Sequence, residues 1–307
     1  MNKISIVGAG RVGESTAQFI AEKKLCQELM LIDIREGVPQ GVALDIQETA
    51  PLLGFDTEVN GSHHADAMKD SELVIVTAGI PRQPGMSRSD VLGTNVKIID
   101  SIAADIKQYA PNAFVIVVSN PVDSLTYRML KQTGFPRNRV FGQAGVLDST
   151  RMASFIAMET GLSILDIHAM VLGGHGDSMV PMTRFTTISG IPIKHYLDDK
   201  TIEEIVDRTR NGGAEILGLR KTSSAYDAPA ASVTAMVESI VHNSKRVLPC
   251  VAILEGEYAQ QDVAMGVPCV LSAKGLERII ELPLNEEEQK LFDSTIASIQ
   301  KDLHNLP

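Results

Sequence analysis

His175 is the residue with the clearest capacity for chemistry, and it lies within the glycine-rich run GGHGD at positions 173–177. Histidine both donates and accepts protons near neutral pH. Its small neighbours leave space around the imidazole ring, and the run follows an apolar segment at 169–172. A histidine satisfied within the core is the alternative, and these open surroundings disfavour it. We therefore predict that His175 is a general acid/base.

Asp148 and Arg151, three positions apart, form a second candidate group. Residues three apart on a helix share a face, so both side chains can point toward one pocket. A simple surface salt bridge is the alternative. Asn120 and Pro121 directly follow an apolar segment at 114–118. This pattern indicates a tight turn, open to a cis bond, that aims the Asn120 amide at the crevice beyond the strand end.

A long connection at 79–88 carries Arg82 and Arg88 on either side of a Pro-Gly turn. Loops of this kind often close over a ligand. An ordinary solvated loop is the alternative for this segment taken alone. No spacing of His, Cys and carboxylate residues in the sequence supports a catalytic metal, so none is expected.

The segment GAGRVG at 8–13 follows the first expected strand and opens the first expected helix. Its glycines permit a tight turn and the close approach of a pyrophosphate, which the helix N-terminus then faces. Asp33 ends the second expected strand roughly 20 residues later, where a carboxylate would bind ribose hydroxyls and repel a 2′-phosphate. This favours NAD over NADP, and the nearby Arg35 weakens the preference slightly. A glycine-rich turn and a solvated strand end are the alternatives.

Other strand ends extend the expected cofactor site, because ligands bind at the carboxyl ends of strands in open α/β sheets. One polar run, 77–79, follows the third apolar segment, and Val118 ends the fourth. The residues expected to contact NAD are Gly8, Ala9, Gly10, Arg11, Val12, Gly13, Asp33, Thr77, Ala78, Gly79, Asn95, Val118 and Asn120.

Two patterns of secondary structure position these groups. The first half has expected strands at 3–7, 29–33, 73–78 and 114–118, with helices at 12–24, 41–50 and 96–109. Nearly continuous apolar runs indicate strands covered on both faces, so we predict an α/β fold with a Rossmann-type doubly wound parallel sheet. The second half has expected helices at 149–160, 202–219, 228–242 and 286–303, and a hairpin formed by 247–254 and 266–271. We predict a nucleotide-binding domain at 1–142 and an α+β substrate domain at 143–307.

The bulk composition is that of a globular protein and disfavours several partners. Of the 307 residues 44% are hydrophobic and 21% charged, and the net charge is -10 without a basic block, so nucleic acid is not an expected partner. No apolar run reaches the roughly 20 residues that a membrane helix needs. Scattered cysteines and the lack of a signal peptide favour the cytoplasm.

Together these motifs resemble the lactate/malate dehydrogenase family over essentially the whole chain. The glycine segment at 8–13, Asp33, the Asn-Pro pair at 120–121, the Asp and Arg at 148 and 151, and GHGD at 174–177 occur in the family's order. The resemblance implies hydride transfer between C2 of a 2-hydroxy acid and nicotinamide. It also implies that His175 moves the hydroxyl proton and that Asp148 orients its ring.

The resemblance assigns the remaining polar residues to the substrate. Arg151 would bind the C1 carboxylate, Arg88 would polarise the carbonyl after loop closure, and Asn120 would hydrogen-bond the reacting oxygen. Arg82 aligns with the position where the malate enzymes carry arginine and the lactate enzymes typically glutamine. A second carboxylate, at C4 of malate, needs a second cation.

The resemblance is strongest to the bacterial, lactate-dehydrogenase-like malate dehydrogenases. It implies NAD-dependent oxidation of malate and a homo-oligomer, with a tetramer favoured and a dimer as the second option. Two alternatives stay open. One is a dehydrogenase of lactate or another 2-hydroxy acid, and the other is a non-catalytic NAD-binding regulatory protein, which would leave His175, Asp148 and the three arginines unexplained.

Overall fold

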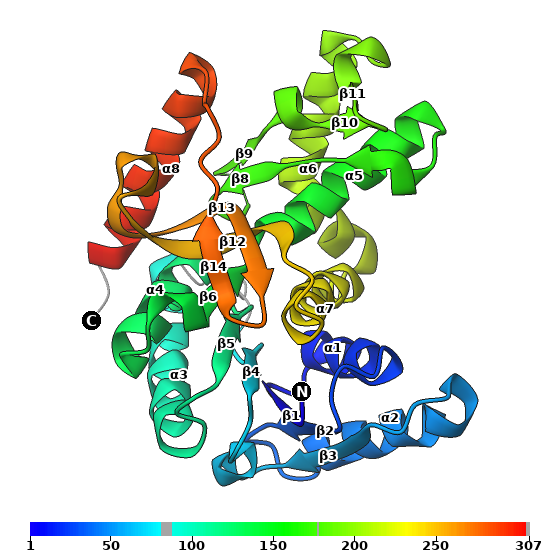
Figure 1. The fold of residues 1–307 in the computed structure, drawn as a ribbon, viewed down its shortest axis with the longest axis vertical. Coiled ribbons are helices and arrows are strands. Elements are labelled where there is room, and N and C mark those ends of the chain that lie inside the picture. Colours follow the sequence, from blue (N-terminus) through cyan, green and yellow to red (C-terminus); the bar gives the residue numbers. More distant parts are fainter. Residues whose placement is uncertain (81–87, 177, 305–307) are drawn as a thin grey trace.

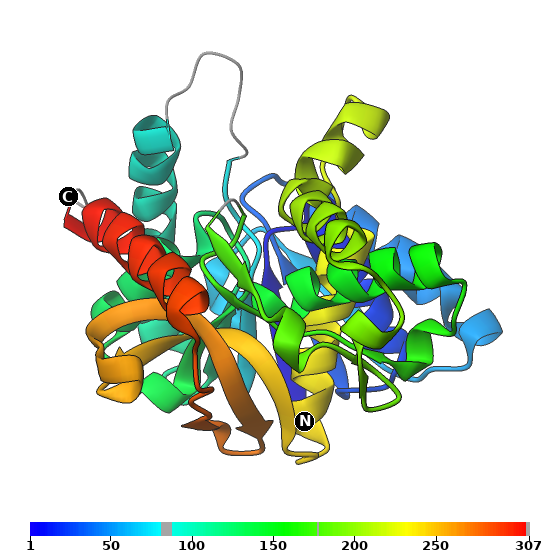
Figure 2. The ribbon, with the colours of Figure 1, turned by 90° about the horizontal axis from the view of Figure 1, so that it is seen from above.

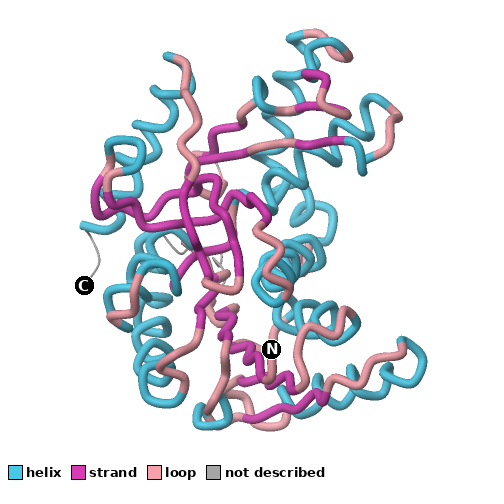
Figure 3. Tube along the Cα trace, viewed as in Figure 1, coloured by secondary structure: helices cyan, strands magenta, loops and turns pink. Residues whose placement is uncertain are grey.

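The computed structural model describes residues 1–80, 88–176 and 178–304, and for residues 88–90 it describes the backbone alone. A single large sheet runs through the centre of the described chain, with helices on both of its faces (Figure 1, Figure 3). The first half of the chain supplies its parallel strands and the second half its antiparallel strands.

Six parallel strands form one side of this sheet, in the order β3-β2-β1-β4-β5-β6. They are β1 (Lys3–Val7), β2 (Glu28–Ile32), β3 (Glu58–Ser62), β4 (Leu73–Val76), β5 (Phe114–Val117) and β6 (Val140–Gln143). This is the strand order of the Rossmann fold, so the predicted doubly wound sheet is confirmed. Neither β3 nor β6 was predicted. The sequence of β3, EVNGS, has a single apolar residue and lies at the sheet edge.

Helices cover both faces of the parallel strands. They are α1 (Arg11–Glu22), α2 (Val38–Leu53), α3 (Arg88–Tyr109) and α4 (Val122–Thr133). α1 and α2 pack on one face through buried residues such as Ile20 and Ile46. α3 and α4 pack on the other through Ile99 and Met129, and Figure 1 shows them side by side. The connections between strands and helices therefore converge at the carboxyl edge of the sheet.

The second half extends the same sheet. The predicted hairpin is confirmed as β12 (Arg246–Glu255) and β13 (Gln261–Ser272), and β12 pairs antiparallel with β6 through Cys250 and Gln143. The other strands joined to it are β8 (Val171–Gly173), β9 (Met179–Pro181) and β14 (Gly275–Ile279). A separate small sheet contains β7 (Ile167–His168), β10 (Thr187–Ile188) and β11 (Ile191–Pro192).

Four long helices surround these strands, namely α5 (Gly145–Thr160), α6 (Asp199–Arg220), α7 (Asp227–Val241) and α8 (Glu286–His304). Short 3-10 turns are η1 (Ala65–Met68), η2 (Arg137–Arg139), η3 (Ile164–Asp166), η4 (Thr183–Phe185), η5 (Ile193–His195) and η6 (Glu257–Ala259). α8 lies across the antiparallel strands, as Figure 2 shows, and buries Phe292, Ile296 and Ile299. Among the described helices, none is long and apolar enough to cross a membrane.

Candidate active site

The glycine segment at 8–13 lies where β1 and β4 end together. Gly8 has φ +112°, and its carbonyl accepts a hydrogen bond from Thr77 Oγ1 at 2.9 Å. A Cβ on Gly13 would lie 1.9 Å from Gly8 O, so only glycine fits there. A Cβ on Gly10 would meet nothing within 4 Å. The chain therefore packs tightly against itself at Gly8 and Gly13 and leaves open space at Gly10, as the approach of a pyrophosphate requires.

A cavity of about 580 Å³ opens beside this segment. Six of its lining residues were predicted to bind the cofactor, namely Gly8, Gly10, Asp33, Thr77, Ala78 and Gly79. α3 adds residues that the sequence analysis did not single out, namely Ile98, Ser101, Ile102 and Asp105. Their signal was weak, because an apolar stripe on a helix usually marks the core. The cavity lies at the carboxyl edge of the sheet, and its lining residues fit a dinucleotide.

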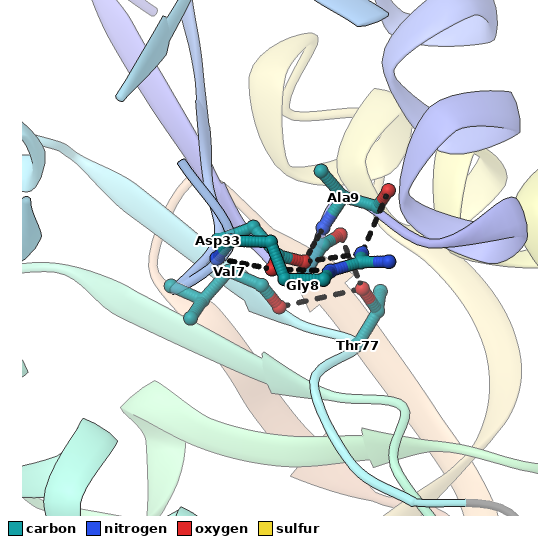
Figure 4. A network of polar contacts seen from close by, with 6 residues as sticks. Val7, Gly8, Ala9, Asp33 and Thr77 are labelled. Atoms are coloured by element: carbon teal, nitrogen blue, oxygen red, sulfur yellow. Dashed lines mark hydrogen bonds and ion pairs between the residues drawn. The ribbon is translucent and has the colours of Figure 1, made fainter. Parts of the chain in front are cut away.

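Asp33 lies at the rim of this cavity and is held by two neighbours. Its Oδ2 accepts from Ala9 N at 2.9 Å, and Arg35 donates from Nε to Oδ1 and from Nη2 to Oδ2, both at 2.8 Å (Figure 4). The hydrogen bond from Arg35 is the main reason that the pKa of Asp33 is lowered to about 2. Asp33 is therefore a carboxylate over the whole neutral range, in the position expected for a ribose-binding group.

Asn95 joins two loops at the strand ends. Its Oδ1 accepts from Ile80 N at 2.8 Å, and its Nδ2 donates to Asn120 O at 2.7 Å. The bond between Asn120 and Pro121 is cis, and Asn120 itself is exposed. In this structure the Asn95 amide contacts protein backbone, so its predicted contact with the cofactor stays a prediction. The geometry shows how Asn95 fixes the loop that carries Asn120.

His175 and Asp148 meet although they come from different elements. His175 follows β8, Asp148 lies in the first turn of α5, and His175 Nδ1 is 2.9 Å from Asp148 Oδ2. Ser149 Oγ accepts from Val171 N at 3.0 Å, and a Cβ on Gly145 would be 2.6 Å from Val171 O. These contacts hold α5 against β8 close to the His175–Asp148 pair.

The carboxylate of Asp148 serves a second partner. Arg151 Nη1 donates to Asp148 Oδ1 at 3.2 Å, and the side chains of Asp148 and Arg151 are only 2% and 12% exposed. The pair is therefore not a surface salt bridge. Arg151 Nε is buried and has no hydrogen-bond partner among the described residues. A buried guanidinium with a free donor is suited to bind an anion such as a substrate carboxylate.

The surroundings set the proton affinity of His175. Burial is the largest single influence and lowers its pKa, but the charge of Asp148 and the hydrogen bond to it outweigh burial, so the pKa is raised. Nδ1 faces Asp148, which leaves Nε2 to exchange a proton with a ligand. The arrangement can act as a general base when His175 is neutral and as a general acid when it is protonated.

A second carboxylate, that of Asp123, contacts the backbone of His175. It is in the first turn of α4, and its Oδ2 accepts from the backbone N–H of His175 at 3.3 Å. Its Oδ1 is buried without a hydrogen-bond partner in the described part of the chain. Burial raises the pKa of Asp123 to about 6. Asp123 was not predicted to be a site residue, because nothing in its spacing links it to His175.

Two predicted substrate residues cannot be placed in the same way. Arg82 lies outside the described residues, and Arg88 begins α3 but its side chain is not among those described. Their predicted roles stay predictions. Over the described ranges, His, Cys, Asp and Glu residues form no group that could hold a metal ion.

Comparison with known proteins matches both halves of the chain to one family. Residues 2–142 match the NAD-binding domain of lactate/malate dehydrogenase, and residues 145–306 match its alpha/beta C-terminal domain. The malate dehydrogenase of Thioalkalivibrio sulfidiphilus is 63% identical over 306 residues, with 100% of both chains covered. That of Nitrosococcus oceani is 61% identical, covering 100% of this chain and 98% of the relative.

Solved structures of malate and lactate dehydrogenases also match almost the whole chain. The malate dehydrogenase of Salinibacter ruber superposes with a TM-score of 0.95 at 41% identity, covering 99% of this chain and 97% of that one. A lactate dehydrogenase of Cryptosporidium parvum, complexed with lactic acid and nicotinamide adenine dinucleotide, has a TM-score of 0.95 at 39% identity, with 99% and 97% covered. The fold alone therefore does not separate the two substrates.

Proposed function

The chain belongs to the lactate/malate dehydrogenase family, and we propose that it catalyses the reversible oxidation of (S)-malate to oxaloacetate with NAD as its cofactor. The observation that carries this proposal is the buried Asp148 carboxylate, which contacts His175 on one oxygen and Arg151 on the other. The Asp148 carboxylate therefore fixes the positions of both the proton-transferring group, His175, and the anion-binding group, Arg151. A purely NAD-binding regulatory protein would have no use for this arrangement.

The residues divide the chemistry among them. When bound, NAD accepts a hydride from C2 of malate. His175 accepts the hydroxyl proton in this direction and returns it when oxaloacetate is reduced. Asp148 accepts from Nδ1, keeps Nε2 free for the substrate, and stabilises the imidazolium that forms. Arg151 binds the C1 carboxylate through its guanidinium group, whose Nε has no hydrogen-bond partner in the described part of the chain.

Three further residues complete the proposed site. Asn120 donates a hydrogen bond to the reacting oxygen, from the loop that Asn95 holds. Arg88 polarises the same oxygen. Arg82 binds the C4 carboxylate, which distinguishes malate from lactate, because a methyl group beside this guanidinium would leave its charge unpaired. The relatives with 63% and 61% identity, both malate dehydrogenases, support this choice.

The test compares NADH oxidation with oxaloacetate, pyruvate and 2-oxoisocaproate. We expect oxaloacetate to have the highest kcat/KM, and equal turnover of pyruvate would overturn the malate proposal. Arg82→Gln should lose the preference for oxaloacetate. Arg139→Gln removes a guanidinium that donates to Pro111 O and should keep the preference. Unchanged selectivity in Arg82→Gln would show that Arg82 does not bind the C4 carboxylate.

We also propose a cofactor-binding domain at 1–142, a catalytic domain at 143–307, and a homo-oligomer, preferably a tetramer, in the cytoplasm. The two matched family models support the division. Exposed apolar side chains on α2, Leu44 at 60% and Leu52 at 89%, support association. The three cysteines are free thiols, as a reducing compartment favours. Light scattering of the purified protein tests the assembly, and a monomeric mass would refute it.

A further inference from the structure

The adenosine end of the cofactor site contains a cation that its proposed task does not require. Arg35 donates to both oxygens of Asp33, from Nε and Nη2, each at 2.8 Å. Its Nη2 also lies 3.4 Å from Ala9 O, on the glycine segment. Figure 4 shows Asp33 and Ala9 joined in this network beside Gly8 and Thr77. The carboxylate expected to bind the ribose is thus already occupied by a guanidinium.

We propose that Arg35 enables this site to bind NADP in addition to NAD, by contacting the 2′-phosphate that Asp33 alone would repel. The inference deepens the proposed function and rests on it, since it concerns the cofactor of that same reaction. The ligand class is a dinucleotide with a phosphate monoester on its adenosine ribose. NAD remains the preferred cofactor.

Charge is the first argument. A lone carboxylate at the end of β2 repels a dianionic phosphate, and this repulsion is a common basis for selecting NAD. Here the paired guanidinium brings the local net charge of the two side chains to zero. Arginine also presents five N–H donors in a planar fork, which suits phosphate. Its Nη1 makes no hydrogen bond to a described residue and remains available to an incoming anion.

Position is the second argument. The Arg35 backbone is fixed, because its N–H donates to Asp33 Oδ1 at 3.1 Å and its carbonyl accepts from Val38 N at 3.2 Å. Its side chain remains 56% exposed, whereas that of Asp33 is 10% exposed. Both residues line the 580 Å³ cavity together with Gly8 and Gly10. The side chain of Arg35 can therefore move from Asp33 to a ligand while the Arg35 backbone stays in place.

The same pairing has a consequence for NAD. Ribose hydroxyls reach Asp33 only by replacing the N–H groups of Arg35, so Arg35 competes with NAD and assists NADP. Because an exposed ion pair changes affinity little, this competition should weaken NAD binding by no more than roughly fivefold. A charge-assisted bond to phosphate should raise the affinity for NADP by roughly 10- to 150-fold.

The test is a double-mutant cycle on Asp33 and Arg35, measured by fluorescence titration of NADH and NADPH without substrate. Arg35→Gln should weaken NADPH binding about tenfold while NADH binding stays the same or tightens. Asp33→Ser should tighten NADPH binding, and the double variant should lose that gain. Arg139→Gln serves as a matched loss of surface charge and should change neither dissociation constant.

The proposal is overturned if the unmodified protein shows no NADPH binding at millimolar concentration. It is also overturned if removing Arg35 leaves NADPH affinity unchanged in both the Asp33 and the Asp33→Ser backgrounds. Reduction of oxaloacetate by NADPH is then measured as a second readout. Because the titrations contain no substrate, a failure of the proposed malate chemistry would appear only in that second assay and would leave the assignment of Arg35 intact.

Discussion

Asp123 accepts a hydrogen bond from the backbone N–H of His175 at 3.3 Å, although the two residues are 52 positions apart. Asp148 contacts the ring of the same histidine, so two carboxylates from two helices hold His175, one at its backbone and one at its imidazole. Both carboxylates raise the pKa of His175, Asp148 more strongly than Asp123. The buried Asp123 can therefore influence catalysis through charge without touching the substrate.

Asp123→Asn should shift the pH dependence of malate oxidation to lower pH. The asparagine keeps an acceptor for His175 N–H but removes a negative charge, so the pKa of His175 falls. Malate oxidation needs neutral His175, and its kcat/KM rises with pH through that pKa; the rising limb therefore moves toward acid. A pH profile of kcat/KM checks this, with Asp262→Asn, at an exposed pair with Lys131, as the control. If Asp123 had only a structural role, the rising limb of the kcat/KM profile would not move.

The same variant should become relatively more stable as pH rises from about 4 to about 6. Asp123 has a folded-state pKa of about 6 against 3.8 for the free side chain. The folded protein therefore binds a proton in this window that the unfolded chain releases, and the wild type loses stability as pH rises. Asparagine does not titrate, so the Tm of the variant relative to that of the wild type should increase as pH rises. A constant difference from pH 4.5 to 7.5 would contradict the raised pKa.

Asp148→Asn should lower kcat by about 10²-fold, because the imidazolium loses its stabilising charge and its fixed orientation. The pKa of His175 is raised mainly by Asp148, so the acid limb of malate oxidation should also move to lower pH. Steady-state kinetics across pH test both effects. Asp207→Asn, which removes an exposed partner of Arg210, is a suitable control. Retention of full kcat would show that Asp148 is not the orienting group.

Local patterns were sufficient to predict two of the parallel strands whose carboxyl ends border the site. The expected strand at 3–7 coincides with β1, and the expected strand at 114–118 extends one residue beyond β5. Their β-branched, continuous apolar runs have few other interpretations in a chain of this length. By contrast, β3 carries polar residues at a sheet edge, and α5 begins at Gly145, four residues before the expected helix. Neither feature leaves a periodic signal in the sequence.

Contacts between distant segments were harder to predict. The proximity of Asp148 and His175 was expected from the family resemblance, and the 2.9 Å contact is present. The contact of Asp123 with His175 depends on how α4 packs against the loop after β8, which no spacing in the sequence specifies. The pairing of Asp33 with Arg35 likewise depends on the rotamer of Arg35, and the contact of Asp33 with Ala9 N depends on how the glycine segment folds.

Arg151→Lys should raise the KM for oxaloacetate and lower kcat/KM roughly 10- to 100-fold, since lysine keeps the charge but loses the planar fork. The pH profile should stay in place, because the positive charge beside Asp148 is preserved. Kinetics with oxaloacetate check the prediction. Arg208→Lys, at an exposed pair with Glu215 on α6, should behave as the unmodified protein. An unchanged KM would remove Arg151 from the substrate site.

Gly10→Ala and Gly13→Ala form a matched pair that separates folding from cofactor binding. A methyl at Gly13 would lie 1.9 Å from Gly8 O, so we expect a lower Tm and a loss of roughly 1 to 3 kcal/mol in unfolding free energy.

Gly10 has φ −87° and no atom within 4 Å of its Cβ position, so alanine should leave the Tm nearly unchanged. Because Gly10 lines the cavity, its methyl would instead occupy space beside the pyrophosphate and weaken NADH binding about tenfold, or 1.4 kcal/mol. Calorimetry and NADH titration measure the two effects. Unaltered NADH affinity in Gly10→Ala would place the pyrophosphate elsewhere.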